Sequence, residues 1–411
     1  MWQSLMSCGS LSSESQTAMK NGCSCWFLPQ RKGRGDSVHS HFLRGVLFVL
    51  FLFTISDGKV EAGQSSSPPS LSTGVRPLRE YADERGLWIG TTIQDVHWED
   101  DSQYQPTLAR EFNAGVAFLF MRLTQPQRNQ FHFRVMDTLK AFARKNNMKL
   151  AGHALLYRNS TEPEWLRFDQ ADCGGWRREE LDAILKQHVQ TVVAHGGDDF
   201  YVWDVVNEPL ARNGSLLQKC WQQILGEEHL AQAFRYAREA NPRVLLRLNE
   251  TFGENGIDLV KAEKFFALVQ RMKGNHVPID AVGIQMHLEA DDLRSTYVSE
   301  LRRFLLDAQA IGVLVHITEM DVYQGTGLVS AYQLERQKAV YKTIMKTCLE
   351  FPRCTSFTTW GLTDKYSWLR NRRKNAYPNA QPLLFDENYL PKPAYFGLIE
   401  AIGESPAARG E

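Results

Sequence analysis

Residues 200–208 read FYVWDVVNE, a run of aromatic and β-branched residues that ends in an amide and a carboxylate. Such a run is typical of a strand that is buried on both faces. Seven more runs of this character lie along the chain, at 86–93, 115–123, 148–157, 243–250, 281–287, 313–322 and 355–362. Between them lie segments with apolar residues at helical spacing, such as 133–146 and 262–274. The chain therefore alternates short strands with amphipathic helices.

This alternation predicts right-handed βαβ units and a parallel sheet, an α/β fold. Eight repeats favour a closed (β/α)₈ TIM barrel, which typically takes about 250 residues. The runner-up is a doubly wound sheet, but no Gly-rich phosphate loop follows the first strand. We expect a single catalytic domain over 81–404, followed by a short tail at 405–411.

Polar or functional side chains stand where six of these strands end. They are His153, Asn207 with Glu208, Asn249 with Glu250, Gln285 with His287, Glu319 with Asp321, and Trp360. TIM-barrel enzymes place their chemistry at the carboxyl ends of the strands. One such residue satisfies loop backbone as readily as it binds a ligand. Six together predict an active site.

Side-chain alternation along a strand indicates which residues share a face. In VLVHITEMDV, Glu319 falls on the face of Val313, Val315, Ile317 and Asp321. By the same reasoning FYVWDVVNE places Glu208 with Val202, Asp204 and Val206. We therefore expect both glutamates to point toward the barrel axis at its mouth. The alternative for either one is a salt bridge to a loop arginine.

Retaining glycoside hydrolysis needs a carboxylic acid that protonates the leaving oxygen and a carboxylate about 5–5.5 Å away that attacks the anomeric carbon. Glu208 and Glu319 fit these two roles. Asn207 lies on the opposite strand face, where a turn could bring its amide to a sugar hydroxyl. His287 could donate to Glu319, with Asp321 orienting the imidazole.

At these residues the chain resembles glycoside hydrolase family 10, the endo-1,4-β-xylanase family. The resemblance covers roughly 85–402 and is carried by WDVVNEP (203–209), GIQMHL (283–288), ITEMDV (317–322), TTWGLTDKYSWL (358–369) and PLLFDENYLPKPAYFGL (382–398). It implies that Glu208 is the acid/base and Glu319 the nucleophile. It also implies that the subsites around the cleaved bond are lined by His153, Asn207, Gln285, His287, Trp360 and Trp368.

The chain departs from the family pattern on the glycone side of the site. A Glu-Asn-x-Met-Lys segment is usual after the second strand, and residues 118–122 read FLFMR here, so only Arg122 could replace the lysine. A Gly-His-x-Leu-x-Trp-His pattern appears with Tyr157 for the tryptophan and Arg158 for the last histidine. We expect glycone binding to be weaker or differently selective.

The most consistent function is retaining endo-hydrolysis of xylan or a related β-1,4-linked polysaccharide. A xylan transglycosylase, in which a sugar hydroxyl outcompetes water, is one alternative. A polysaccharide-binding barrel with weak or no catalysis is another, although retention of both glutamates argues against it. The 47 basic and 47 acidic residues balance, which gives no reason to expect nucleic acid as a partner. No metal or other cofactor is expected.

Residues 45–55 read GVLFVLFLFTI, eleven apolar-biased residues after a basic region. A membrane span needs about 20, so we expect a secretory signal over 1–62, cleaved in the mature protein. A type II membrane anchor is the alternative for the same segment. A Ser/Pro-rich linker is expected over 63–80, and the secreted protein is expected to be a monomer.

Four cysteines fall in the expected domain, an even number that suits an oxidising compartment. Cys348 and Cys354 flank a short Pro-containing loop and are expected to pair, and a Cys173–Cys220 bridge is a further hypothesis.

Three asparagines begin an N-glycosylation triplet. Asn159 and Asn213 fall in expected loops and are candidate acceptors. Asn249 ends a strand and is expected to be unmodified.

Overall fold

The fold is described from a computed structural model, which covers residues 76–157, 161–291, 293–325, 327–372 and 377–405. The strands within these ranges are β1 (Trp88–Thr92), β2 (Ala114–Phe118), β3 (Lys149–His153), β4 (Phe200–Asn207), β5 (Leu245–Thr251), β6 (Ala281–Gln285), β7 (His287–Glu289), β8 (Leu314–Tyr323) and β9 (Cys354–Thr359). Every pairing between them is parallel.

The sheet closes on itself. Its order runs β6-β5-β4-β3-β2-β1-β9-β8, and a further pairing of β6 with β8 joins the two ends. The short strand β7 pairs with β8 beyond the end of β6. The predicted (β/α)₈ barrel is confirmed, with all eight expected strands in it.

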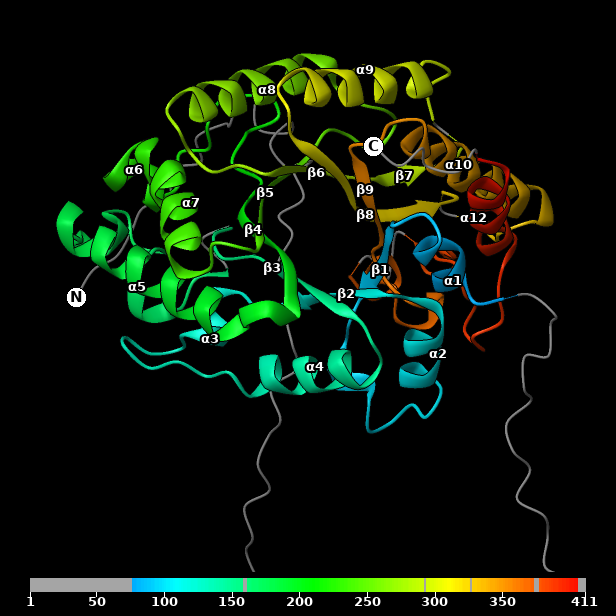
Figure 1. Cartoon of the computed structure of the whole chain (residues 1–411), viewed down its shortest axis with the longest axis horizontal. Coiled ribbons are helices and arrows are strands. Elements are labelled where there is room, and N and C mark those ends of the chain that lie inside the picture. Colours follow the sequence, from blue (N-terminus) through cyan, green and yellow to red (C-terminus); the bar gives the residue numbers. More distant parts are fainter. Residues whose placement is uncertain (1–75, 158–160, 292, 326, 373–376, 406–411) are drawn as a thin grey trace, which may run out of the picture. The chain divides into compact units, whose positions relative to one another are not determined.

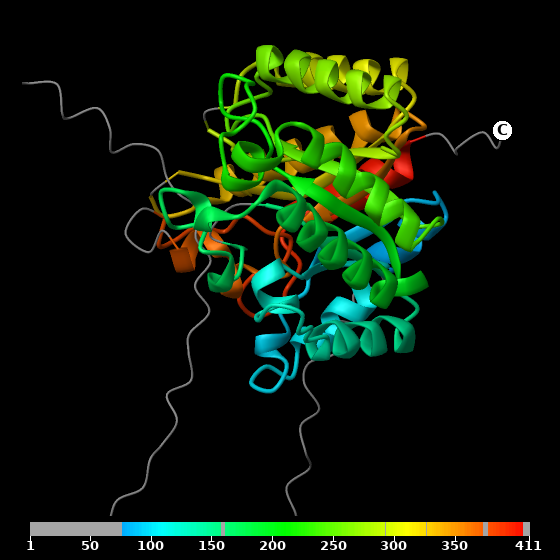
Figure 2. The ribbon, with the colours of Figure 1, turned by 90° about the vertical axis from the view of Figure 1, so that its left-hand side faces the viewer.

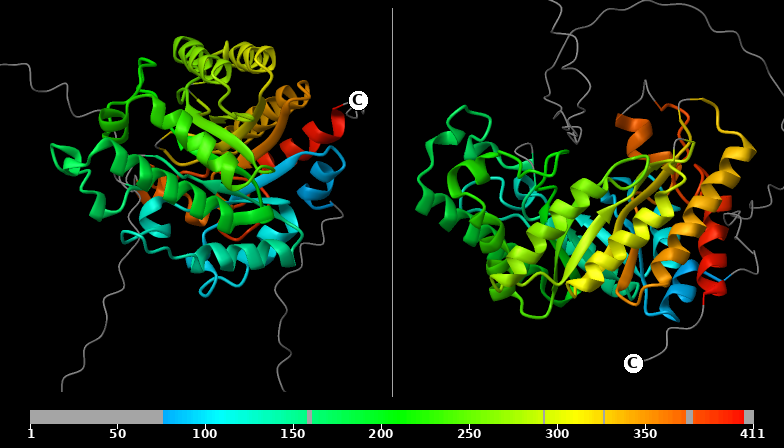
Figure 3. Two further views of the ribbon diagram at one scale, coloured as in Figure 1. Left: turned by 60° about the vertical axis from the view of Figure 1, so that its left-hand side comes forward. Right: turned by 90° about the horizontal axis from the view of Figure 1, so that it is seen from above.

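Helices surround the barrel in every view (Figures 1, 2 and 3). The α-helices in the described part of the chain are α1 (Leu78–Asp83), α2 (Tyr104–Glu111), α3 (Met121–Thr124), α4 (Arg134–Lys145), α5 (Arg178–Gly196), α6 (Cys220–Leu225), α7 (Glu228–Ala240), α8 (Leu259–Gly274), α9 (Tyr297–Ala310), α10 (Ala331–Leu349), α11 (Trp368–Arg372) and α12 (Pro393–Glu404). Local sequence sets their ends. Asp258 caps α8, and Ser330 with Gln333 forms a capping box on α10.

The first and last helices close the ring together. Figure 1 shows α12 beside α10 and α1 beside α12. Leu78 and Ala82 of α1 are buried, and Glu111 accepts hydrogen bonds from the Leu78 amide at 3.0 Å and the Tyr395 hydroxyl at 2.8 Å. The folded unit therefore begins before residue 81, although we predicted that the linker would extend to residue 80.

Three predicted strands are shorter than their apolar runs. β2 ends at Phe118, and Met121–Thr124 form helix α3 instead of continuing it. β3 ends at His153 rather than at 157. The run 281–287 divides into β6 and β7. Past the ends of β2 and β3 the apolar residues Leu119, Met121 and Leu155 are buried outside the sheet, so apolarity alone gave the wrong boundary.

Two apolar layers hold the barrel. The larger one lies between strands and helices and includes Trp203, Leu246 and Phe357. The smaller one fills the barrel interior and contains Ala114, Val116, Ala151, Tyr201, Val202 and Trp360. A strand side chain in the smaller layer therefore points into the barrel, and one in the larger layer points toward the helices.

A buried polar network crosses the barrel below its mouth. Arg247 of β5 donates from Nε to Asp204 Oδ1 at 2.6 Å and from Nη2 to Oδ2 at 3.0 Å. Burial opposes the ionised form of Asp204, but Arg247 and His153 outweigh it and lower the pKa of Asp204 to about 2. Burial and the Arg247 charge hold the pKa of His316 well below its usual value. His316 is therefore neutral, and its Nδ1 accepts from Arg247 Nη1 at 3.0 Å.

Arg247→Ala is expected to destabilise the protein strongly. It would leave Asp204 as a buried carboxylate without its bidentate partner, which typically costs about 3–5 kcal/mol. Urea denaturation would measure the loss. Arg243→Ala is the matched control, because Arg243 pairs with Asp198 on the surface, where both side chains are mostly exposed. Equal losses in the two variants would contradict the prediction.

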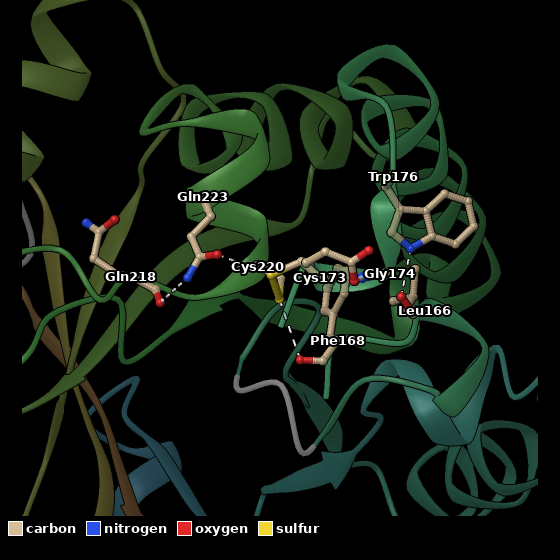
Figure 4. Close-up of a disulfide and its surroundings, with 9 residues drawn as sticks. Leu166, Phe168, Cys173, Gly174, Trp176, Gln218, Cys220 and Gln223 are labelled. Carbon is tan, nitrogen blue, oxygen red and sulfur yellow. Dashed lines mark hydrogen bonds between the residues drawn. A yellow bond between two sulfur atoms is a disulfide. The ribbon is translucent and has the colours of Figure 1, made fainter. Parts of the chain in front are cut away.

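Both expected disulfides are present. Cys173 pairs with Cys220 across 47 residues of sequence, and Cys348 pairs with Cys354 across 6. Figure 4 shows the first bridge joining the loop after β3 to the segment that carries α6. On the loop side the Trp176 indole donates to the Leu166 carbonyl at 2.7 Å.

Other expectations fall only partly on described residues. The expected signal or anchor lies outside them, as does Asn159. Asn213 is exposed, whereas Asn249 is fully buried. Across the described ranges, none of the helices has both the length and the apolarity to cross a bilayer.

Candidate active site

Irregularities in two strands place the site residues. Against β5, the register of β4 shifts between Asp204 and Val206, so that Asp204 pairs with Arg247 and Asn207 with Asn249. The inserted residue leaves Val206 in the outer layer. A bulge of this kind reverses the alternation of side chains beyond it.

Strand β8 shifts in the same way against β9, between Ile317 and Met320. Val315 and Ile317 point to the outer layer, while Thr318 and Glu319 both reach Asn249 across the barrel.

The prediction was correct for Val202, which lies in the interior layer, but it was wrong for other residues below the mouth. Val206, Val313, Val315 and Ile317 face the helices rather than the barrel axis. Asn207 faces the interior, not the opposite side. The prediction assumed that side chains alternate strictly between the two faces of a strand. A bulge adds one residue, so a side chain beyond it that strict alternation would place toward the helices points to the barrel axis instead.

Glu319 is 4% exposed and is held by two donors. Asn249 Nδ2 donates to its Oε1 at 2.8 Å, and His287 Nε2 lies 3.0 Å from its Oε2. The Thr318 hydroxyl donates to Asn249 Oδ1 at 2.8 Å, which keeps the amide nitrogen toward Glu319. One oxygen of this carboxylate thus meets an amide and the other an imidazole.

His287 lies between two carboxylates. Its Nδ1 is 3.0 Å from Asp321 Oδ2, and its Nε2 faces Glu319. Burial favours the neutral imidazole, but Asp321 and Glu319 outweigh it and raise the pKa of His287 to about 10. The imidazole is therefore a cation at neutral pH. The Trp368 indole donates to Asp321 Oδ2 at 2.7 Å and fixes this carboxylate.

Glu208 has different surroundings. It follows β4 with a φ of 51° and is half-buried. Its Oε1 accepts from the Tyr157 hydroxyl at 2.8 Å and from Gln285 Nε2 at 3.1 Å. Both are neutral donors, whereas Glu319 faces a cation. The two carboxylates are therefore differentiated by their partners.

Three amides link the two glutamates. Asn207 Oδ1 accepts from Asn249 Nδ2 at 2.8 Å and from Gln285 Nε2 at 3.4 Å. A glycine makes room for this arrangement, because a Cβ at Gly283 would lie 2.1 Å from Asn249 Oδ1. Glu208 and Glu319 thus belong to one hydrogen-bonded cluster at the mouth of the barrel.

Aromatic side chains border this cluster. Trp360 is 7% exposed and meets the rings of His153 at 5.3 Å and His287 at 6.1 Å, both edge-on. Trp368 is half-buried and lies edge-on to His287 at 5.2 Å. His153 donates from Nδ1 to Asp204 at 2.8 Å, which raises the His153 pKa despite burial. These residues come together as the sequence suggested.

The end of β2 and the segment that follows it form an apolar wall beside His153 and Trp360. Phe118 is half-buried against the rings of His153 and Trp360, and the Phe120 ring lies 6.1 Å from Tyr157. Arg122 lies over Phe120, with Cζ 5.9 Å from the ring centroid. Leu119 is 2% exposed and packs in the outer layer, so it does not line the site.

The sequence placed Asn249 among the polar strand ends, and it placed Phe120 and Tyr157 in the segments that depart from the family pattern, but it gave none of the three a specific role. Their contacts with Glu319, Arg122 and Glu208 appear only in the structure. The described residues hold no cluster of His, Cys, Asp and Glu suited to a metal ion.

Comparison with known proteins adds independent information. A family model described as Glycosyl hydrolase family 10 matches residues 77–401. Endo-1,4-beta-xylanase B of Thermotoga neapolitana is 34% identical over 80% of this chain and 92% of the relative. Endo-1,4-beta-xylanase of Agaricus bisporus is 33% identical over 80% and 96%. The crystal structure of xylanase 10B from Thermotoga petrophila with xylobiose has a TM-score of 0.73 and 31% identity, over 80% of this chain and 97% of that one.

Proposed function

The chain belongs to glycosyl hydrolase family 10, and on that premise we propose that it cleaves internal β-1,4 bonds of xylan with retention of configuration. One observation carries the proposal. Glu208 and Glu319 lie in one hydrogen-bonded cluster at the barrel mouth, the first among neutral donors and the second beside a cationic imidazole.

The surroundings of the two glutamates support the proposed roles. The His287 cation stabilises the negative charge of Glu319, which suits a nucleophile that must be ionised before it attacks. Glu208 accepts from the Tyr157 hydroxyl and the Gln285 amide, and in this proposal it carries the proton. Glu319 attacks the anomeric carbon, the bond to the leaving oxygen breaks, and Glu208 gives that oxygen its proton. Water then displaces Glu319 and returns a proton to Glu208.

The remaining residues bind the sugars in this proposal. Gln285 and Asn207 orient the glutamates and offer amides near the cleaved bond. Trp360 and Trp368 give flat faces on which sugar rings pack. His153 and Arg122 lie on the glycone side. The partner is xylan or a related β-1,4-linked polysaccharide, bound by an extracellular, monomeric protein without a cofactor.

Purified protein should release xylo-oligosaccharides from xylan faster than it attacks mannan, cellulose or mixed-linkage glucan. NMR of the first products should show the β-anomer before mutarotation, as expected for carboxyl groups about 5–5.5 Å apart. An α-anomer would exclude the assigned mechanism. Binding to xylan without any release of reducing ends would indicate a binding barrel. Products longer than the substrate at high oligosaccharide concentration would indicate transglycosylation.

Phe118→Glu is expected to lower KM for unsubstituted xylo-oligosaccharides. A sugar hydroxyl held by a carboxylate gains about 1.5 kcal/mol, or roughly tenfold in KM, and Phe118 offers no such group. Leu119→Asn is the matched control, because Leu119 packs away from the site; it should lower stability without lowering KM. If Phe118→Glu instead raises KM and the wild type prefers decorated xylan, the wall serves a bulkier substrate.

A further inference from the structure

Glu250 is a buried acidic residue that the proposed mechanism does not use. It lies on β5, where Leu246 and Leu248 belong to the outer apolar layer, and alternation places Glu250 on the same face. Its side chain is fully buried. A carboxyl group in such surroundings is costly unless its oxygens are hydrogen-bonded. The donors that face Glu250 therefore indicate why it is held there.

Three donors face the two carboxyl oxygens of Glu250. The Thr251 amide donates to Oε1 at 2.9 Å, and Lys261 Nζ donates to the same oxygen at 3.0 Å. The Leu210 amide donates to Oε2 at 2.9 Å. Lys261 belongs to α8 and is only 6% exposed, so the ion pair lies inside the protein. The Glu250 side chain thus joins β5, α8 and the loop after β4.

The contact with this loop lies two residues after Glu208. Pro209 stands between them and has no amide hydrogen, so residues 208–210, here called the acid/base turn, have two backbone donors. The Glu208 amide donates to the Asn249 carbonyl at 2.9 Å, and the Leu210 amide donates to the Glu250 carboxyl group. Both donors of the acid/base turn are therefore bonded to consecutive residues of β5.

The acid/base turn has a backbone conformation that needs such support. Glu208 has a φ of 51°, in the left-handed region that disfavours residues with a Cβ. A conformation of this kind persists only where the surrounding contacts hold it. The direction of the Glu208 side chain follows from it. Loss of the bond at Leu210 would let the backbone relax and would move the Glu208 carboxyl group.

We propose that Glu250, held by Lys261, is a positioning residue that keeps the acid/base turn in the conformation from which Glu208 reaches the leaving oxygen. This inference rests on the proposed role of Glu208. A general acid must lie within hydrogen-bonding reach of the atom that it protonates, and a misplacement of about 1 Å can cost roughly 10²-fold in rate. Tyr157 and Gln285 contact the Glu208 carboxyl group itself, whereas Glu250 acts on it through the backbone.

Three variants separate the reach of the side chain at position 250 from its charge. Glu250→Leu combined with Lys261→Met removes the bond to Leu210 together with the ion pair, so that no unpaired ammonium group stays buried. Glu250→Gln combined with Lys261→Met restores a side-chain oxygen at the original length. Glu250→Asp keeps the negative charge beside Lys261, but its shorter side chain recedes from the Leu210 amide. The proposal predicts a loss in the first and third variants and recovery in the second.

The expected loss depends on the leaving group. On xylo-oligosaccharides kcat of the first and third variants should fall about tenfold or more, within the roughly 10²–10⁴-fold that general acid catalysis supplies, with little change in KM. The second variant should stay within about threefold of wild type. With a dinitrophenyl xylobioside, the burst rate reports formation of the glycosyl-enzyme. It should fall at least about fivefold less than kcat on xylo-oligosaccharides, because this phenol departs without a proton.

Glu111→Leu is the matched control. Glu111 is also a buried carboxyl group that accepts from a backbone amide, that of Leu78 at 3.0 Å, but it lies at the end of α2 and contacts α1 and α12. Its replacement should lower the thermal unfolding temperature. It should leave the ratio of the rates on the two substrates as in wild type.

Equal losses on both substrates would show that Glu250 only stabilises the fold, and would overturn the inference while leaving the proposed hydrolysis intact. Wild-type activity in Glu250→Asp together with a loss in the second variant would also overturn it, because charge rather than reach would then matter. Thermal unfolding shows whether each variant is folded, and Glu250→Asp decides the question if the first variant is not. If the wild type hydrolyses no β-1,4-glycoside, the proposed function fails and the inference with it.

Discussion

Glu319→Ala is expected to lower kcat on every substrate by roughly 10⁴-fold or more, the scale seen when a covalent nucleophile is removed. No leaving group can compensate, because the bond that Glu319 forms is needed whatever departs. Xylan and activated aryl glycosides should therefore lose activity together. Turnover measured on both substrates checks this.

With external azide added, the anomeric configuration of the product also tests the assignment of Glu319. In Glu319→Ala a small anion can enter beside His287 and attack the face that the carboxylate used. The product is then the α-glycosyl azide, inverted from a β-linked substrate. Unchanged thermal unfolding and retained binding of xylo-oligosaccharides would show that the variant is folded. A β-azide from this variant would contradict the assignment of Glu319 as nucleophile.

Glu208→Ala is expected to show the opposite dependence on the leaving group. General acid catalysis contributes typically about 10²–10⁴-fold, so hydrolysis of xylan should fall by this factor. Formation of the glycosyl-enzyme from a dinitrophenyl xylobioside should fall far less, because this phenol departs without a proton. The activated substrate should give a burst followed by slow turnover, since no base then activates water.

Azide should accelerate that slow phase and give the β-glycosyl azide, since the anion attacks the intermediate from the face that the leaving group left. The two variants therefore control each other: one should give the α-azide and the other the β-azide. Equal losses of Glu208→Ala on xylan and on the dinitrophenyl substrate would show that the acid/base is a different residue.

The fold could be predicted because its signal is repeated. Eight apolar runs alternate with helical patterns, and a mistake at one boundary does not change the number of strands. The ends of β2 and β3 were misplaced because Leu119 and Leu156 are buried outside any strand. Burial by loops at the barrel mouth looks the same in sequence as burial in a strand.

The sequence predicted which residues gather at the barrel mouth but not their geometry. Glu208 and Glu319 were expected there from their positions at strand ends, and they lie there, yet the faces assigned to Val206 and Ile317 were wrong. A bulge depends on how two strands meet, and a single strand's sequence does not record its partner's register. The partners of Arg247 could not be predicted for the same reason, because Asp204 lies on the neighbouring strand β4 and His316 reaches Arg247 from β8.

The Cys173–Cys220 bridge has a consequence for the free protein. It ties the loop that follows β3, in which Tyr157 lies, to the segment after β4 that carries Lys219. Closing 47 residues of chain removes about 4 kcal/mol of conformational entropy from the unfolded ensemble. By linking these segments, the bridge also limits their motion before substrate arrives. Reduction of the Cys173–Cys220 bridge should make the entropy of substrate binding less favourable, because more configurational freedom is then lost on binding. This effect is expected even where every contact in the bound state is unchanged.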